Sequence, residues 1–375
     1  MSTVPLHPRH ARLPRLARLP RSRHRTGTRV LAGAVAVATA ALLSGCGLRW
    51  ETPPPTEPTP DAAETARRTA VDDALDLADA AAGAAAGAVE PVAGVLALVD
   101  GTAATHVDAL GGVYDSGLED PTPTAVPTAT TPAATPADVL ALLGAAASRA
   151  RADALDAQDP GLARLLAAVA ASRAQLTDRL AAALGATAPP VDAAPPVDAV
   201  PEDEAAPSAT PTATATTGSP APTEPAPTEP APAAGSDLGR TALVALTVAE
   251  DRTGFGLEVA AARLSGDARA LARGSAGAHR AEATSWATAA GVAGTVDDPR
   301  RVTYAVGADL TGEAGVPAFC AGLLADLAGV HADAVLETSA GTADRTATVD
   351  GVRAAAVESL AWGAAPTALP GLPAQ

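Results

Sequence analysis

The chain of 375 residues contains no lysine, no isoleucine and only 2% aromatic residues. Because isoleucine and the aromatic residues are typical of strands, their scarcity argues against a β-sheet core. The apolar residues that remain are mostly alanine, leucine and valine, and alanine is the strongest helix former. The composition therefore predicts an all-α fold of closely packed helices.

Basic residues are also scarce outside the first 29 positions. The chain has 26 arginines and 42 acidic residues, and eight of the arginines, but none of the acids, lie in this leader. From residue 30 onward, 18 arginines face 42 acids, a net charge of −24. This balance excludes a nucleic-acid partner, which requires a basic surface, and a broad electrostatic attachment to anionic lipid.

Only two cysteines are present, and the first follows an unusual leader. An apolar run, Val30–Leu43, is too short for a membrane span of roughly 20 residues. The following Leu43-Ser44-Gly45-Cys46 resembles the lipobox of bacterial lipoproteins, in which the cysteine is acylated and the leader removed. We expect residues 1–45 to be a signal peptide and lipid on Cys46 to anchor the chain at the extracytoplasmic face of the cell membrane. The alternative is an uncleaved signal anchor.

One cysteine and one histidine, residue types that often act in catalysis or metal binding, are predicted to be core residues. Cys320, left without a disulfide partner if Cys46 carries lipid, lies in an apolar helical context. His106 shares one helical stripe with Leu96, Val99 and Leu110. We therefore interpret Cys320 as a small core residue and His106 as a hydrogen-bonded core histidine.

Composition divides the mature chain into four parts. Residues 46–60 form a Pro/Thr tether, and residues 61–187 form an Ala-rich helical domain. Residues 188–235 are a low-complexity Pro/Thr/Ala linker that cannot bury a core and is predicted to be disordered, with glycosylation of its threonines left open. Residues 236–375 form a second helical domain; whether 61–187 is another copy of it stays open.

Helix signals give four helices in each helical domain. In the first, Asp61 is an N-cap, Pro91 opens the second helix, and Asp159-Pro160 is a cap followed by proline at the first helical position. The predicted ranges in the two domains are 61–90, 91–114, 137–157, 160–184, 236–264, 267–292, 317–338 and 342–362. In both domains, a long crossover joins the second helix to the third.

Four segments of the second domain carry a resemblance to a known family: Leu246–Glu250, Ala278-His279-Arg280, Tyr304-Ala305-Val306, and the ending from Trp362 to Pro373. They resemble the ferritin-like domain of unknown function found in actinobacterial lipoproteins, over about residues 236–373. The resemblance implies a four-helix bundle with one long crossover and no known activity. Asp251 and Phe255 stand where that family leads us to expect His and Tyr.

The sequence does not contain all the residues that a complete di-iron site requires. Such a site takes a Glu from each of two helices and Glu-x-x-His from each of the other two. No acid precedes a histidine by three residues, and no histidine follows His331. Glu250 on the first helix and His279 and Glu282 on the second remain on predicted inward stripes. They form either a hydrogen-bonded cluster that fixes helix register or a mononuclear site whose metal is unknown.

Two functions follow from these features. The first is a non-enzymatic lipoprotein that acts as an interaction or structural module of the cell envelope, with an unidentified envelope protein as partner and no cofactor. The second is a metal carrier or metal-dependent oxidoreductase that holds iron or another divalent metal at Glu250, His279 and Glu282. No phosphate-binding loop, nucleophile elbow or zinc motif is present.

Overall fold

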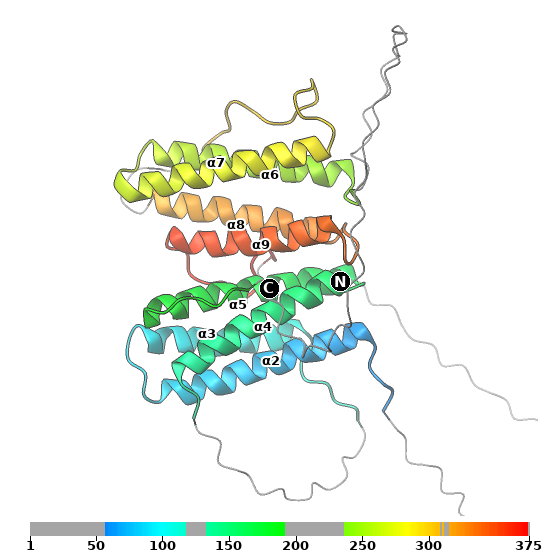
Figure 1. Ribbon diagram of the computed structural model, residues 1–375, viewed down its shortest axis with the longest axis vertical. Helices are drawn as coiled ribbons and strands as arrows, with labels where there is room; N and C mark the ends of the chain where they lie inside the picture. Colours follow the sequence, from blue (N-terminus) through cyan, green and yellow to red (C-terminus); the bar gives the residue numbers. More distant parts are fainter. Residues whose placement is uncertain (1–56, 118–132, 192–235, 308–309, 311–314, 374–375) are drawn as a thin grey trace, which may run out of the picture. The chain divides into compact units, whose positions relative to one another are not determined.

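The computed structural model describes residues 57–117, 133–191, 236–307, 310 and 315–373. These residues form eight α-helices and no strand, which confirms the all-α prediction (Figure 1). The helices are α2 (Ala62–Ala85), α3 (Val92–Ala109), α4 (Pro136–Asp156), α5 (Pro160–Leu184), α6 (Arg240–Ala261), α7 (Gly266–Ala289), α8 (Gly315–Val335) and α9 (Ala343–Ala361). The predicted signal peptide, Cys46 and most of the linker lie outside the described residues.

Helix starts follow the capping residues in the sequence. The Asp61 carboxylate accepts a hydrogen bond from the backbone N–H of Glu64 at 2.8 Å, and that of Asp159 accepts from Leu162 at 2.7 Å. Thr135 and Asp138 form a reciprocal capping box at the start of α4. Each cap satisfies N–H groups that have no partner within the helix, which defines where the helix begins.

The eight helices form two sets of four with the same connectivity. In each set the first helix packs against the second and third, and the third packs against the fourth. Ala81, Leu96, Val139 and Leu180 belong to the core of the first set. Cys320 lies in the core of the second set, where burial raises the pKa of its thiol to about 12. The prediction of Cys320 as a core residue is confirmed.

The two sets pack against each other within one compact unit, residues 57–375. The fourth helix of the first set, α5, lies against α9 and α8, so layers of helices stack along the unit (Figure 1). Small residues allow this close approach, because Ala167, Ala170, Ala171 and Ala174 are all buried on α5. A helix that is apolar on nearly every side is a buried helix.

The chain end crosses the junction between the two sets. The backbone N–H of Thr367 donates to Oε1 of Gln175 at 3.0 Å, and Nε2 of His106 lies 2.8 Å from the carbonyl oxygen of Ala368. Burial, and secondarily the charge of Arg173, lower the pKa of His106 to about 3. His106 is therefore a neutral, hydrogen-bonded core residue, as predicted, and its partner is the C-terminal tail.

An arginine without a hydrogen-bonded carboxylate partner among the described residues also joins the two sets. Arg345 on α9 is 1% exposed. Its guanidinium donates to the carbonyl oxygens of Ala154 at 2.9 Å and Ala157 at 3.2 Å, at the end of α4. The carbonyl end of a helix carries partial negative charge and unpaired acceptors, so a cation there is stabilising.

We expect Arg345→Met to lower the free energy of unfolding by about 2 kcal/mol, because it leaves these buried carbonyl groups without a donor. Urea denaturation of residues 57–375 measures the change. Arg179→Met, at an exposed position on α5, is the matched control and should change stability by less than about 0.5 kcal/mol. Equal losses in the two variants would contradict the structural role of Arg345.

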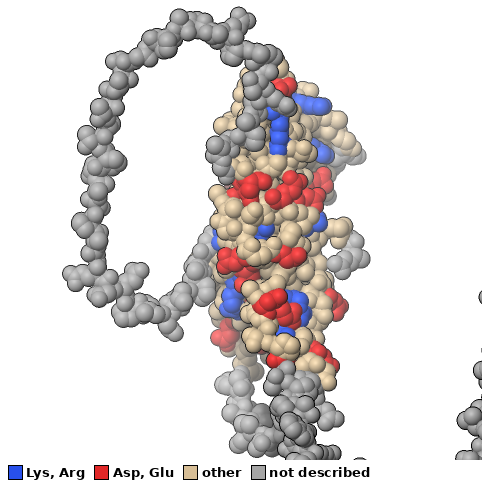
Figure 2. Space-filling model, turned by 90° about the vertical axis from the view of Figure 1, so that its right-hand side faces the viewer, with Lys and Arg blue, Asp and Glu red and all other residues tan. Residues whose placement is uncertain are grey.

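One described helix, α8, is long and apolar enough to cross a membrane, and half of that stretch is buried inside the unit. A core helix of a soluble protein passes the same test. On one face of the molecule, Figure 2 shows several groups of acidic side chains, with arginines between some of them.

Candidate functional site

Each helix of the second set contributes one residue to a buried polar cluster, which we call the Glu–His cluster: Glu250 of α6, His279 of α7, His331 of α8 and Glu358 of α9. Nδ1 of His279 lies 2.6 Å from Oε2 of Glu250, and Nε2 of His331 lies 2.8 Å from Oε1 of the same carboxylate. Nε2 of His279 lies 3.2 Å from Oε2 of Glu358. One buried carboxylate thus joins two histidines from different helices.

The protonation of the cluster follows from these contacts. Burial alone would lower the pKa of His279, but hydrogen bonds to Glu250 and Glu358 outweigh it and raise the pKa to about 9. Burial would raise the pKa of Glu250, but its hydrogen bonds with His279 and His331 lower it below the usual value. His279 is therefore an imidazolium at neutral pH, and it donates from both ring nitrogens to carboxylates.

His331 is fixed by packing as well as by its hydrogen bond. The ring lies 6.4 Å from that of Trp286, centroid to centroid. On its other side a Cβ at Gly351 would overlap the imidazole, so only glycine fits there. Nδ1 is buried and has no hydrogen-bond partner among the described residues. This arrangement fits the tautomer that carries its proton on Nε2 and donates it to Glu250.

The structure brings together two of the three residues singled out in the sequence. Glu250 and His279 are in direct contact, whereas Glu282 lies on the exposed side of α7 without a hydrogen bond to any described residue. Sequence reasoning left out His331 and Glu358, which complete the cluster. The side chain of Ser275, one turn before His279, also bonds to Glu358.

The donor atoms do not fit a di-iron centre. Both oxygens of Glu250 are occupied by histidines, and Nδ1 of His331 faces Gly351 rather than the other ligands. Among the described residues, no group of three or more His, Cys, Asp and Glu side chains is arranged to hold a metal ion. The cluster offers two carboxylates and two imidazoles, whereas a di-iron bundle uses four carboxylates and two histidines.

The first set buries a polar network of different composition. Asp73 of α2 accepts hydrogen bonds from Arg149 at 2.6 Å and from Arg173 at 3.3 Å. Arg173 is fully buried and also donates to the carbonyl oxygen of Ala70 at 2.8 Å. Both sets therefore join their helices through a buried acid that is hydrogen-bonded to side chains of other helices.

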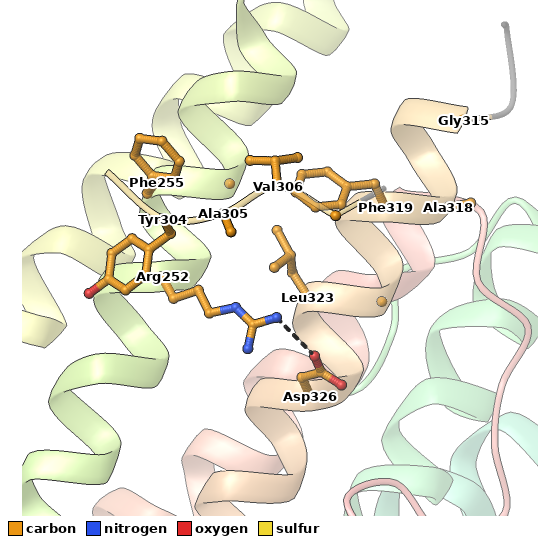
Figure 3. A pocket seen from close by; sticks show the side chains of 13 residues that line it. Arg252, Phe255, Tyr304, Ala305, Val306, Gly315, Ala318, Phe319, Leu323 and Asp326 are labelled. Carbon is orange, nitrogen blue, oxygen red and sulfur yellow. Dashed lines mark ion pairs between the residues drawn. The ribbon is translucent and has the colours of Figure 1, made fainter. Parts of the chain in front are cut away.

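A second feature, the aromatic pocket, lies between α6, α8 and the crossover that precedes α8 (Figure 3). Its volume is about 500 Å³. Phe255 and Gly256 of α6, Phe319 and Leu323 of α8, and Tyr304 of the crossover form its walls. The chain has only two phenylalanines and two tyrosines, and three of these four residues line the aromatic pocket.

Asp251 holds the crossover in place over the pocket. Its carboxylate accepts a hydrogen bond from the hydroxyl of Tyr304 at 2.6 Å and one from the backbone N–H of Arg301 at 3.0 Å. It also pairs with Arg280. Burial and the bond to Asp251 raise the pKa of Tyr304 to about 12. Asp251 and Phe255, the two departures from the resembling family, thus both act at the crossover and the aromatic pocket.

In the comparison with known proteins, one family model matches part of the chain. Residues 242–374 match the family model described as "Domain of unknown function (DUF4439)". No curated protein and no solved structure matches the chain. The match covers α6 except its first two residues, all of α7, α8 and α9, and the tail that crosses between the helix sets. It leaves out the first four helices. Residues 242–374 therefore match a C-terminal domain of unknown function, and the structure shows this part of the chain as a helical bundle.

Proposed function

We propose that the chain is an extracytoplasmic lipoprotein, anchored through lipid on Cys46, which acts by binding an envelope component rather than by catalysis. In this proposal residues 242–374 form a ferritin-like bundle that uses the aromatic pocket as its binding site. The observation that carries the proposal is the gathering of Phe255, Tyr304 and Phe319 at one hollow in a chain with 2% aromatic residues.

The Glu–His cluster supports the same function by its closed arrangement. The Glu250 carboxylate is 3% exposed and has a histidine on each oxygen. Separating the partners of such a buried charge pair is costly, and a substrate would have to break it. The aromatic pocket, by contrast, is open and has the volume of a small-molecule site, about 300–1,000 Å³ in proteins.

The anchor predicts a clear difference between the two cysteines. Cys46→Ser is expected to abolish labelling with a fatty-acid analogue and to remove the chain from the membrane fraction, because two or more acyl chains provide stable attachment. Cys320→Ser, at a buried core position, is the matched control and should keep full labelling. A mature N-terminus other than Cys46, or an unmodified sulfur there by intact mass spectrometry, would refute the anchor.

The binding site is tested by filling the aromatic pocket. Gly322 lines it and lies on the exposed face of α8, where a Cβ would meet no atom within 4 Å. Gly322→Leu should therefore fill the hollow without disturbing the fold, and leucine is a better helix former. Gly277→Leu, at an equally open position on α7, is the control.

We expect a small molecule or partner to co-purify from the envelope with the wild-type chain and with Gly277→Leu, and to be lost from Gly322→Leu. Mass spectrometry of the purified proteins and of their organic extracts measures this. The same co-purifying components in all three proteins would show that the aromatic pocket is not the binding site.

A divalent metal at the Glu–His cluster is the competing function. The observation in its favour is that two histidines and two carboxylates meet from four helices. Elemental analysis of the purified chain decides between the two. Stoichiometric iron, manganese or zinc that is lost in His279→Ala, but kept in Gly322→Leu, would favour the metal function over ligand binding.

A further inference from the structure

We propose that the ligand of the aromatic pocket is a single-chain anionic amphiphile, whose apolar chain lies against Phe319 and Leu323 and whose anionic head pairs with Arg252. This inference rests on the proposed function and names the class of ligand. Three observations carry it: the apolar interior, the charged groups at its edge, and the open face of α8.

The side chains inside the aromatic pocket offer contact without hydrogen bonding. Phe255, Val306, Phe319 and Leu323 contribute only carbon atoms to the lining. The hydroxyl of Tyr304 is engaged by Asp251 at 2.6 Å, and Figure 3 shows it directed away from the hollow. An aliphatic chain is stabilised in such a site by roughly 0.8 kcal/mol per buried methylene.

The lining carries one arginine and one aspartate, and the arginine can pair with an anion. Arg252 and Asp326 lie across the hollow from each other (Figure 3), with 3.8 Å between nitrogen and oxygen. Their side chains are 53% and 70% exposed. A pair this long and this exposed contributes little, so a ligand head with better geometry can replace Asp326. A carboxylate or phosphate can accept two parallel hydrogen bonds from one guanidinium.

A second arginine strengthens the positive charge at this edge. Arg252 and Arg301 both line a neighbouring hollow of about 630 Å³, which shares Tyr304 and Ala305 with the aromatic pocket. Arg301 is exposed, and its backbone N–H is held by Asp251. In a chain with net charge −16, Arg252 at the aromatic pocket and Arg301 at the neighbouring hollow provide a local attraction for anions.

The face of α8 provides room for an extended chain. Gly315, Ala318 and Gly322 line the pocket at helical spacing. A ligand head at Arg252 can therefore extend its chain along small residues of α8.

Calorimetric titration of detergent-free residues 57–375 with dodecanoate, below its micelle concentration, tests the inference. We expect saturable binding to the wild type, equal binding to Gly277→Leu, and at least roughly tenfold weaker binding to Gly322→Leu. Arg252→Gln should weaken binding roughly three- to tenfold, and Asp326→Asn should strengthen it. Dodecyltrimethylammonium, with the opposite charge, should bind the wild type more weakly than dodecanoate.

Several results would overturn the inference. Unchanged affinity in Gly322→Leu would mean that dodecanoate binds outside the aromatic pocket. Unchanged affinity in Arg252→Gln would mean that the anionic head does not pair with Arg252. Self-association of the ligand-free chain that Gly322→Leu abolishes, measured by sedimentation, would assign the groove to a second copy instead. If dodecanoate does not bind, but another component still co-purifies in a Gly322-dependent way, the ligand class fails and the proposed function stands.

Discussion

Glu250→Gln is expected to destabilise the folded chain by about 3 kcal/mol. The substitution keeps the shape of the side chain but removes the negative charge that faces His279 at 2.6 Å. Breaking a buried ion pair from one side costs about 3–5 kcal/mol, because the remaining charge stays buried without its partner. The lower end applies because Glu358 still pairs with His279 at 3.2 Å.

Urea denaturation of residues 57–375 at pH 7 measures this loss. Glu258→Gln is the matched control, because Glu258 lies on the same helix and pairs with Arg280 at 2.9 Å but has a half-exposed side chain. An exposed pair contributes about 1 kcal/mol or less. Similar losses from the two substitutions would contradict the view that the Glu–His cluster stabilises the bundle.

A double-mutant cycle separates the pair from its surroundings. If Glu250 and His279 stabilise each other directly, the combined loss in Glu250→Gln/His279→Gln will be smaller than the sum of the single losses by about 1–3 kcal/mol. Additive losses would mean that each residue acts through other neighbours, such as His331 for Glu250.

The fold could be predicted largely because local signals define helix ends. Asp61 and Asp159 each cap the helix that follows, as predicted, and the apolar stripe of α3 correctly placed His106 in the core. Such signals act within one turn of the chain, so one sequence is sufficient to find them. The match of residues 242–374 supports the coarser part of the resemblance, a C-terminal domain of unknown function.

The packing of the two helix sets against each other could not be predicted from local sequence signals. Arg345 and Gln175 look like ordinary polar residues in the sequence, yet both are buried and donate across the junction between the sets. The only local sign was α5 itself, where an uninterrupted run of small and apolar residues around Ala170 leaves no polar face for solvent. Which surface covers such a helix depends on residues far along the chain.

The Glu–His cluster also depends on contacts that local sequence signals do not reveal. His331 lies eleven residues after Cys320, which is three turns of a straight helix, so both are buried on α8. An apolar stripe that runs from Cys320 in steps of three and four passes through Val330, so it leaves His331 one position to the side. Glu358 lies beside the apolar stripe of α9 and reaches His279 on another helix through its long side chain. Only the spatial arrangement of α7 and α9 reveals that contact.

Alkaline pH is expected to destabilise the chain through His279. Its pKa is about 9 in the folded state, above the value near 6.5 in an unfolded chain. The stability that this shift contributes is therefore fully present below about pH 6.5 and is lost as pH rises through 9. One pKa unit corresponds to about 1.4 kcal/mol, so the loss between pH 6.5 and 9.5 is on the order of 2–3 kcal/mol.

The groups around His279 determine the sign of this effect. Glu250 of α6 and Glu358 of α9 are acids in contact with the imidazole. Glu282 on α7 and His331 on α8 lie nearby, and the latter donates to Glu250. The neighbouring acids favour the imidazolium, so its deprotonation removes two charge-assisted hydrogen bonds at once. Burial disfavours the charged form of His279 and so limits the rise in its pKa.

Thermal unfolding of residues 57–375, recorded from pH 6 to pH 10, measures the effect with His279→Gln as the test variant. The wild type should lose stability steadily above pH 7.5, whereas His279→Gln should start lower and show a flatter profile, because it has no imidazolium to lose. His106→Gln is the control: the pKa of His106 is lowered to about 3, so this variant should keep the wild-type slope. The same alkaline slope in all three proteins would mean that His279 is not the titrating group, and that the Glu–His cluster does not owe its stability to a buried imidazolium.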